Sequence, residues 1–432
     1  MRFFREFWPL IAASFGAIGL IFFVGLFFGV TDRPPAPAMR NVVQELKDLT
    51  YNWRAYFADT PTQHLGRRTH DGDGVVLSEP DRMQPGPTLL TGLFGDVLGF
   101  RLVSESGELM HEWPINFFEV APETMEHQFH ALIHGTHIFP NGDIVANLDG
   151  RSMIRFDKCG QIVWRDSSTA HHSLDLDDDG TLWAPASGIF RTDPRFLALP
   201  ARFDRVVRVD AETGELLLTL DLFDIMLRSD LINIAPHVRE TLDDVTHLND
   251  VEVLDAEMAD AFPMFEAGDL LMSMRNMHTI WVVDGTSHKI KWWFAGPLRG
   301  QHDPDFEPDG TISVFDNRGR ISSAESIDAP EAAVGSRILS IDPATKSYDV
   351  LFQTNDAASF ATNFRGKHEL LANGNILIAE TDRGRAIEVT PAGEIIWSYV
   401  NGYDAENVGW IMQADRLDPA FAGLDWGGCG AG

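Results

Sequence analysis

The sequence predicts an all-β protein, a six-bladed β-propeller with an N-terminal transmembrane helix. A strand–turn–strand unit with alternating apolar residues recurs six times, and its turns lie about 50 to 70 residues apart. That period suits a four-stranded propeller blade with loop insertions. The six units cover residues 100–113, 153–165, 205–220, 279–294, 337–352 and 385–399. The longest connection between units contains a predicted helix at 223–240.

The N-terminal segment supplies the transmembrane part of this prediction. Residues 8–30 form an apolar run without a charged residue, which is long enough to span a bilayer. Arg2 and Arg5 precede the run, so the positive-inside rule places the N-terminus in the cytoplasm and the remainder outside. A cleaved signal peptide is the alternative, because the small residues at 35–38 suit a cleavage site. We favour an uncleaved anchor, since the apolar run is longer than a signal peptide requires.

The same pattern divides the chain into four segments. They are an anchor at 1–30, a proline-containing tether with an amphipathic helix at 31–85, the propeller at 86–415, and a C-terminal tail at 416–432. The chain has two cysteines, Cys159 in a predicted hairpin turn and Cys429 in the tail. Outside the cytoplasm they could form a disulfide that holds the tail. Two free thiols are the interpretation that we favour.

The composition excludes one class of partner. The chain has 34 lysine and arginine residues against 64 aspartate and glutamate residues, a formal net charge of −30. Such a charge favours solubility and argues against nucleic acid as a partner. A local cluster of histidine and arginine side chains would therefore stand out electrostatically.

Histidines recur at a nearly constant position in the inner hairpins that precede the six units. His134, His172 and His302 each lie eight positions before a turn glycine, and His368 lies six positions before its own. A single histidine at the start of a strand is more often structural than functional. A shared register favours function, because independent structural histidines have no reason to agree in position.

The propeller geometry brings further polar residues to the same place. The first strand of a blade lines the central channel and the second returns to the starting rim. His247, which opens one inner strand, is therefore expected beside Arg275, which closes the next. The predicted lining of this channel mouth is His134, His172, His247, His302, His368, Arg275 and Asn249, with Asn317 and Arg318 on the same rim.

We expect neither a metal ion nor a cofactor at this mouth. The carboxylates that usually accompany histidines in a metal site are not in register with them, and Arg275 repels a cation. Residues 175–180 resemble a calcium-binding loop, but Ala186 stands where a glutamate is required, so we favour an acidic hairpin turn. No Walker loop, serine nucleophile motif or dinucleotide fingerprint is convincing.

Several imidazoles with one arginine and one asparagine suit a tetrahedral anion. Arginine supplies a fixed positive charge on a planar fork, and asparagine supplies a neutral donor. One histidine could attack as a nucleophile while another protonates the leaving group. Sulfuryl transfer has the geometry of phosphoryl transfer with less charge, so it needs fewer cations and no magnesium.

Four segments of the chain resemble the bacterial arylsulfotransferase family. They read THLNDVEVL at 246–254, GDLLMSMRN at 268–276, GQHDPDFEPDGTISVFDN at 300–317 and GKHELLANGNILIAETDRGRAIEVTPAGEIIW at 366–397. The resemblance covers roughly residues 130–400 and is specific in order and residue type. It implies a six-bladed propeller that moves sulfate between phenols without a nucleotide cofactor.

The resemblance also implies roles for single residues. His302 matches the nucleophile that becomes transiently sulfurylated, and His172 matches the histidine of an earlier blade. His247, Asn249 and Arg275 match the sulfate-binding and acid–base positions. Two features depart from the secreted members of the family, which carry a separate N-terminal β-domain and a short-loop disulfide near the nucleophile. This chain has a membrane anchor instead, and neither cysteine lies near His302 in the sequence.

We therefore expect a single-pass protein of the bacterial inner membrane whose propeller faces the periplasm. It would transfer a sulfuryl group from an aryl sulfate to a phenol by a ping-pong reaction. The expected catalytic residues are His302, His247, His172 and Arg275, and the expected substrate-binding residues are Asn249, His368, Asn317 and Arg318. The anchor also allows a homo-oligomer or a partner in a membrane complex. Two alternatives stay open: a non-catalytic propeller that serves as a binding or assembly module in a membrane complex, and a metal-dependent hydrolase or lyase.

Overall fold

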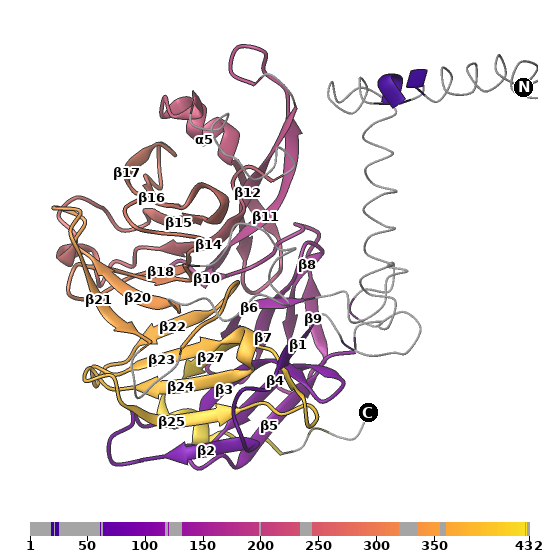
Figure 1. Cartoon of the computed structure of the whole chain (residues 1–432), viewed down its shortest axis with the longest axis vertical. Helices are drawn as coiled ribbons and strands as arrows, with labels where there is room; N and C mark the ends of the chain where they lie inside the picture. Colours follow the sequence, from indigo (N-terminus) through magenta and orange to yellow (C-terminus); the bar gives the residue numbers. More distant parts are fainter. Residues whose placement is uncertain are drawn as a thin grey trace, which may run out of the picture.

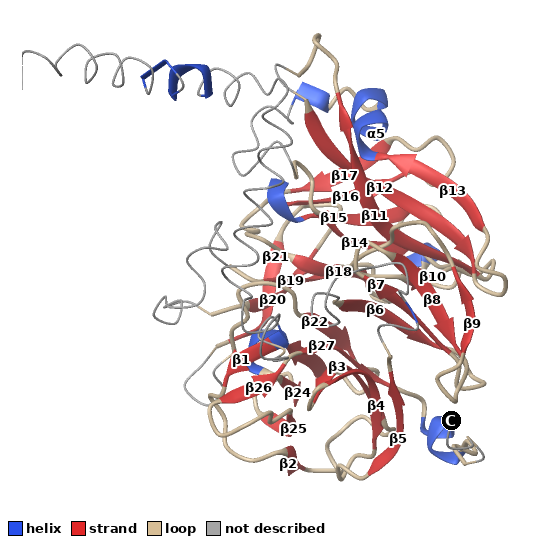
Figure 2. Cartoon of the chain, turned by 90° about the vertical axis from the view of Figure 1, so that its right-hand side faces the viewer, coloured by secondary structure: helices blue, strands red, loops and turns tan. Residues whose placement is uncertain are grey.

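The structure is a computed structural model that describes residues 19–20, 22–25, 61, 64–116, 120, 132–197, 200–233, 244–318, 335–354, 360–427 and 429. Within these residues, six antiparallel sheets follow one another around a central channel (Figures 1 and 2). The innermost strands of neighbouring sheets contact one another, which makes each sheet one blade. The predicted six-bladed β-propeller is therefore confirmed, and the predicted units form its outer hairpins.

The blades are numbered here in chain order of their outer hairpins, with strands given from the channel outward. Blade 1 is β27 (Ile411–Arg416), β3 (Thr88–Phe94), β4 (Val97–Val103) and β5 (Leu109–Pro114). Blade 2 is β6 (Ile133–Ile138), β7 (Ile144–Leu148), β8 (Ser152–Phe156) and β9 (Ile162–Arg165). Blade 3 is β10 (Asp175–Leu176), β11 (Thr181–Arg191), β12 (Ala201–Asp210) and β13 (Leu216–Asp221).

The second half of the propeller repeats this order. Blade 4 is β14 (Leu248–Val253), β15 (Leu270–Met274), β16 (Thr279–Val283) and β17 (Ile290–Phe294). Blade 5 is β18 (His302–Phe306), β19 (Ile312–Asp316), β20 (Arg337–Ile341) and β21 (Tyr348–Gln353). Blade 6 is β22 (Lys367–Leu370), β23 (Ile376–Glu380), β24 (Arg385–Val389), β25 (Ile395–Val400) and β2 (Gly74–Ser78).

Two strands from the ends of the propeller close the ring. β27, near the C-terminus, is the innermost strand of blade 1 and pairs with β3. β2 lies before the predicted start of the propeller at residue 86 and adds a fifth, outermost strand to blade 6. A separate pair joins β1 (Leu65–Arg67) to β26 (Asn407–Gly409). The first and last blades are thus each completed by a segment from the opposite end of the domain.

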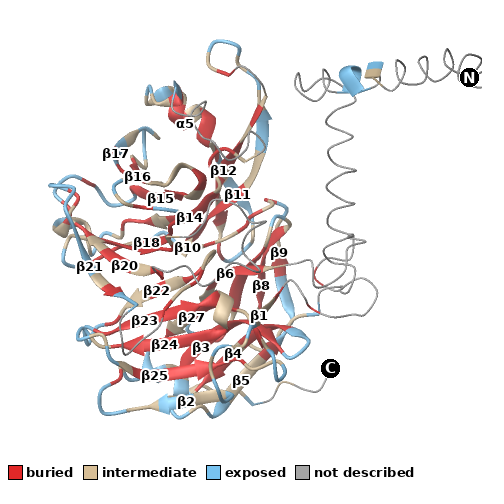
Figure 3. Ribbon diagram, viewed as in Figure 1, coloured by how far each residue is buried: buried red, intermediate tan, exposed pale blue. Residues whose placement is uncertain are grey.

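Apolar side chains fill the space between adjacent blades. Leu270, Met272 and Trp281 of blade 4 pack with Phe203 and Val206 of blade 3 in one such layer. Figure 3 shows that the inner strands of the blades are mostly buried. Burial of an apolar side chain stabilises a fold by about 1.5 to 3 kcal/mol, so these layers hold the ring together.

A belt of polar side chains also joins the blades along the channel. At five of the six blade boundaries, a side chain of one innermost strand accepts a hydrogen bond from a backbone N–H of the neighbouring innermost strand. The pairs are Gln413 with Thr136, Asp175 with Val253, Glu252 with Phe306, Asp303 with His368 and Glu369 with Arg416, at 2.5 to 2.9 Å. At the remaining boundary, Nδ2 of Asn147 donates to the carbonyl of Ser173 at 2.8 Å.

The belt corrects one expectation from the sequence, that no carboxylates accompany the histidines. Four of its six members are carboxylates that face the channel below the predicted mouth. Burial raises the pKa of Asp175 to about 7 and that of Glu369 to about 8. The interior of the channel therefore holds carboxyl groups that are partly protonated near neutral pH.

Short helical elements lie in the connections. α5 (Leu222–Arg228) begins at the capping carboxylate of Asp221 and ends where Asp230 adopts a φ of 57°. The helix predicted at 223–240 is thus shorter among the described residues, and residues 234–240 lie outside them. The 3₁₀ turns are η4 (Ala259–Ala261), η5 (Arg275–Met277), η7 (Thr381–Arg383) and η8 (Pro419–Gly423).

The predicted anchor at 8–30 and the amphipathic helix within 31–85 fall mostly outside the described residues. Residues 19–20 and 22–25 are helical. Within the described parts of the chain, none of the helices has the length and apolar character needed to cross a membrane. Both segments remain predictions.

The two cysteines form a disulfide, so the expectation of two free thiols is wrong. Cys159 follows β8 in its hairpin turn, and Cys429 lies in the tail; their Cα atoms are 5.3 Å apart across a separation of 270 residues. Trp426 holds the same tail by stacking on His111 with ring centroids 4.9 Å apart. The tail is therefore fastened to the outer part of blades 1 and 2, away from the channel mouth.

Candidate active site

A small cavity of about 30 Å³ opens among the innermost strands at the predicted channel mouth. Its lining is His134, Gly135, His172, Ser173, Asn249, Asp250, His302, Asp303, Arg365, Gly366, Lys367 and Met412. One water needs about 10 to 15 Å³ of such volume. The cavity thus suits a tetrahedral group of a few heavy atoms, and an aromatic ring must stay outside it. A larger cavity of about 270 Å³ between β11, β13 and α5 contains none of these residues.

β-Bulges in four innermost strands point side chains into this cavity. The pairing register slips by one residue after His134, Leu248, His302 and Ile411. The extra residues are Gly135, Asn249, Asp303 and Met412, and all four line the cavity. A bulge re-aims a side chain that a regular strand would direct elsewhere, which explains how neighbours in sequence face one site.

The backbone around the mouth is strained. His172, His247, Asp303, Arg318 and Arg365 adopt the left-handed region, with φ between 44° and 63°. Residues other than glycine rarely adopt this region, and such strain concentrates at functional sites. The clustering of five strained residues at one end of the channel marks it as a candidate active site.

His302 is held in one orientation and one tautomer. Its Nδ1 lies 2.7 Å from Oδ1 of Asn317, whose Nδ2 donates to the carbonyls of Thr362 and Arg365. Because Oδ1 of Asn317 is an acceptor, Nδ1 of His302 carries the proton and Nε2 keeps a lone pair. Burial and the nearby charge of Arg275 lower the pKa of His302 well below its usual value, so the imidazole is neutral.

His247 is oriented by a carboxylate. Its Nδ1 donates to Oδ2 of Asp244 at 2.6 Å, which directs the opposite ring nitrogen, Nε2, away from the acid. Burial opposes the ionisation of Asp244, but the hydrogen bond and charge of His247, together with the charges of Arg202 and Arg275, outweigh burial and lower the pKa of the acid. The His247 ring meets the His172 ring edge-on, with centroids 5.1 Å apart. Sequence reasoning missed Asp244, although it lies only three positions before His247.

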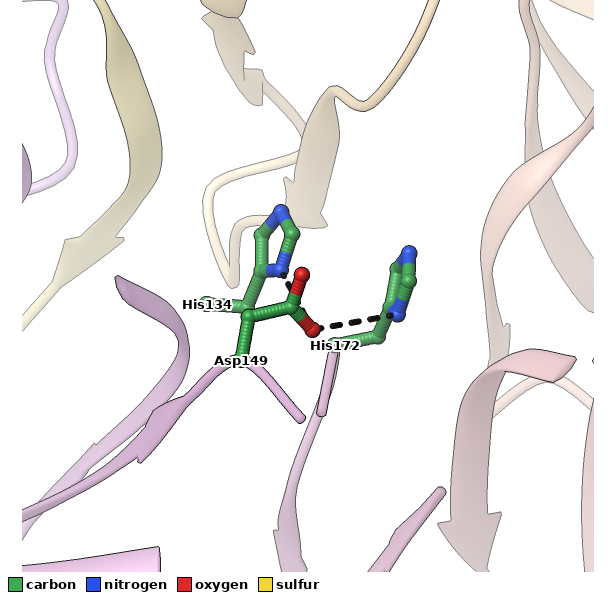
Figure 4. A group of neighbouring side chains, drawn as sticks. All are labelled: His134, Asp149 and His172. Atoms are coloured by element: carbon green, nitrogen blue, oxygen red, sulfur yellow. Dashed lines mark ion pairs between the residues drawn. The ribbon is translucent and has the colours of Figure 1, made fainter. Parts of the chain in front are cut away.

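His134, His172 and Asp149 form a compact group on one side of the mouth (Figure 4). The His134 and His172 rings stack with centroids 4.6 Å apart, and Oδ1 of Asp149 lies 3.6 and 3.8 Å from their Nδ1 atoms. Nδ1 of His172 also lies 2.7 Å from Nδ1 of His171. Burial lowers the pKa of both His134 and His172, so both rings are neutral.

The spacing of these three ligand atoms is within the range of a metal site, but their orientation is not. The two stacked rings are inclined by only 16°, and the lone pair of an imidazole nitrogen lies in the plane of its ring. Because the rings are stacked face to face, their planes are offset from each other and their in-plane lone pairs do not converge on one ion. The guanidinium of Arg365 also acts electrostatically on Asp149 and His134. The group therefore suits hydrogen bonding better than metal coordination.

Asn249 and Arg275 lie next to the histidines. Asn249 lines the cavity; its Nδ2 donates to the carbonyl of Gln301 at 2.8 Å, and its buried Oδ1 has no partner within the described residues. The Arg275 guanidinium lies over the ring of Phe364 at 5.2 Å and donates to Oδ1 of Asn276. Its backbone N–H donates to the carbonyl of His247, so β14 and the end of β15 meet at this point.

Two residues expected to bind substrate are placed differently. His368 does not line the cavity: its side chain is fully buried one layer below, between Asp303 at 3.1 Å and Ser313 at 2.8 Å. Arg318 also lies outside the cavity lining, and so do His247 and Arg275, which were expected to be catalytic. Asn317 reaches the site through His302, because its side-chain amide is used by that ring and by backbone carbonyls.

Two cationic residues in the lining were missed by the sequence reasoning. Arg365 and Lys367 stand on either side of Gly366 in the connection that leads into β22. Lys367 forms ion pairs with Asp303 and Asp250 at the floor of the cavity. These acids raise the pKa of Lys367 well above its usual value although burial opposes it. The only sequence signal was their position just before His368.

The fold and site together define a β-propeller with a polar, histidine-rich cavity at one channel mouth. A family model described as arylsulfotransferase (ASST) matches residues 135–402. The chain therefore belongs to the arylsulfotransferase family, which makes it an enzyme of the sulfotransferase type. The matched range contains every cavity-lining residue given above except His134 and Met412.

Solved structures with a similar fold are distant in sequence. A protein of unknown function from Bacteroides caccae is 11% identical, with a TM-score of 0.47, 76% of this chain covered and 98% of that one. A streptogramin B lyase is 11% identical (TM-score 0.41; 78% and 87% covered), and TolB from Acinetobacter baumannii is 12% identical (TM-score 0.41; 76% and 66% covered). These likenesses carry no argument about activity. Among proteins with curated descriptions, none matches the chain.

Proposed function

We propose that this protein transfers a sulfuryl group from an aryl sulfate to a phenol through a covalent sulfohistidine on His302. The observation that carries the proposal is the fixed tautomer of His302. Asn317 holds the proton on Nδ1, which leaves the Nε2 lone pair beside the cavity. A neutral imidazole whose Nε2 carries a lone pair and no proton is the form that attacks, and here that lone pair accepts only a hydrogen bond of 3.2 Å from the Arg365 backbone N–H.

In the first half-reaction, Nε2 of His302 bonds to sulfur and the bond between sulfur and the aryl oxygen breaks. The electron pair of that bond leaves with the oxygen, which takes a proton from Nε2 of protonated His247. Asp244 accepts a hydrogen bond from Nδ1 of His247 and stabilises the imidazolium before transfer. The sulfohistidine carries its positive charge beside Oδ1 of Asn317, which accepts the Nδ1 hydrogen.

The second half-reaction reverses these steps with the acceptor. Neutral His247 takes the proton of the phenol, the phenol oxygen bonds to sulfur, and the bond between sulfur and His302 breaks. Neutral His302 and protonated His247 are thereby restored. Arg275, Asn249 and His172 hold the sulfuryl oxygens in both steps. Donors that are already in position stabilise the negative charge on these oxygens most strongly in a site that excludes water.

The small cavity supports a division between the two parts of the substrate. A sulfuryl group enters it, and the aromatic ring stays at the mouth. We also propose that the apolar N-terminal run anchors the chain in the bacterial inner membrane with the propeller in the periplasm. The disulfide between Cys159 and Cys429 supports this location, because such bonds persist in oxidising compartments.

The test is turnover of 4-nitrophenyl sulfate by the full chain in detergent, with a phenol as acceptor. The wild type is expected to release nitrophenolate and, without acceptor, to gain the mass of one sulfuryl group on the peptide that contains His302. His302→Ala should lose both signals. His288→Ala, in an outer turn of blade 4, is the matched control. Undiminished release of nitrophenolate by His302→Ala would refute the mechanism.

A further inference from the structure

Arg365 lines the cavity just before β22 of blade 6, whereas Arg275 directly follows β15 of blade 4 and lies outside the lining. Both cations act electrostatically on the reacting histidine, and the Arg365 backbone N–H lies 3.2 Å from its Nε2. Each guanidinium lowers the pKa of His302, and Arg275 also acts on Arg365. Two guanidinium groups therefore act on His302, and one of them, Arg365, was not among the residues expected from the sequence.

Aromatic faces hold both guanidinium groups. Arg275 lies over Phe364, and Arg365 lies over the ring of Trp410 at 4.4 Å. Phe364 and Arg365 are consecutive, so one short connection positions both cations. Asn317 fixes that connection by donating to the carbonyls of Thr362 and Arg365. Stacking of this kind orients a planar fork while leaving its N–H groups available.

Two buried donors beside the cavity have no protein acceptor within the described residues. They are Nε of Arg365 and Nε1 of Trp410. Leaving a buried N–H unpaired is costly, and it is normally paired with a ligand or an ordered water. Both atoms carry hydrogen and neither is an acceptor, so the missing partner is an acceptor, which a sulfuryl oxygen supplies.

The backbone of Arg365 also contacts the nucleophile, His302. Its N–H donates to Nε2 of His302 at 3.2 Å, and its φ of 63° places the peptide in that position. When Nε2 bonds to sulfur, its lone pair is no longer available to this N–H. The sulfuryl oxygens then lie next to the donor, which is where an oxyanion is stabilised.

We propose that Arg365 is a second sulfuryl-binding residue that clamps the transferred group through its side-chain fork and its backbone N–H. The inference rests on the proposed function and adds to it a residue outside the expected set. Arg275 and Arg365 grip the sulfuryl oxygens from opposite sides of His302. Trp410 orients the Arg365 fork by stacking against it.

Binding of inorganic sulfate to the full chain, measured by calorimetry, tests the clamp without catalysis. Arg365→Ala is expected to weaken sulfate binding by about tenfold to a hundredfold, the value of a charge-assisted hydrogen bond. Arg365→Lys keeps the charge without the fork and should give an intermediate affinity. Arg82→Ala, at an exposed ion pair with Glu79, is the matched control. Added guanidinium ion should restore turnover to Arg365→Ala and not to Arg275→Lys.

The outcomes separate this inference from the proposed function. If Arg275→Ala loses sulfate binding and Arg365→Ala keeps it, the clamp is wrong while sulfuryl transfer stands. If the wild type neither binds sulfate nor releases nitrophenolate, the proposed function is wrong. The clamp is then wrong as well, because it depends on that function. Should Arg365→Ala not fold, an unchanged sulfate affinity in Arg365→Lys overturns the clamp.

Discussion

Replacing Asp244 by asparagine tests the acid–base role of His247. The carboxylate accepts the Nδ1 hydrogen of His247 at 2.6 Å in a largely buried position. Asparagine keeps the size of the side chain but removes the negative charge that stabilises the imidazolium. A hydrogen bond to a charged group contributes about 1.5 to 3 kcal/mol, and each 1.36 kcal/mol changes a rate tenfold. Asp244→Asn should therefore lower kcat about tenfold to 150-fold.

The size of this loss should depend on the leaving group. A phenol of high pKa needs a proton as it departs, whereas nitrophenolate leaves readily without one. We expect the full loss with phenyl sulfate and a loss of less than about threefold with 4-nitrophenyl sulfate, measured as kcat for a series of substituted donors. Asp342→Asn, in an exposed turn, is the control. Equal losses across the series would show that Asp244 has only a structural role.

Three further predictions concern the nucleophile, the channel belt and the tail. Asn317→Leu should lower kcat more than it changes KM, because His302 loses the acceptor that fixes its tautomer; an unchanged kcat contradicts this. Glu369 has its pKa raised from 4.5 to about 8, so its contribution to stability is complete below about pH 4.5 and is lost as the pH rises to about 8. Glu369→Gln should therefore raise Tm relative to wild type at pH 8.5 and much less at pH 5, and a difference independent of pH would refute the assignment. Reduction of the disulfide between Cys159 and Cys429 should lower the free energy of unfolding by about 2 to 5 kcal/mol while kcat stays within twofold, since the tail lies away from the cavity; a parallel loss of activity would contradict that separation.

The carboxylates around the cavity also affect which anions the site can bind. Asp303 and Asp250 pair with Lys367 directly below the cavity, and Asp149 lies within the electrostatic range of Arg365. These carboxylates offset much of the positive charge that the cations supply. A singly charged sulfate ester fits such a balance better than a doubly charged phosphate ester.

The sequence alone determined the fold class, and it predicted four of the residues that line the cavity, His134, His172, Asn249 and His302. Alternating apolar residues around a turn encode a hairpin locally, so the six outer hairpins could be predicted without knowledge of their neighbours. The register of His134, His172 and His302 is likewise local, because it counts residues along one inner hairpin. These histidines come to lie at the same end of the channel once the hairpins are arranged around one axis.

The tertiary structure decided what depends on contacts between distant segments. β-Bulges, which no simple periodicity reveals, turn Asn249 and Asp303 into the cavity. Closure by β27, the disulfide over 270 residues, and the approach of Arg365 to His302 and Trp410 all join parts far apart in sequence. Sequence spacing predicted which residues gather at the channel mouth, because blades repeat. Only the folded propeller determines which partner each of these side chains has, because hydrogen bonds and charges act through space.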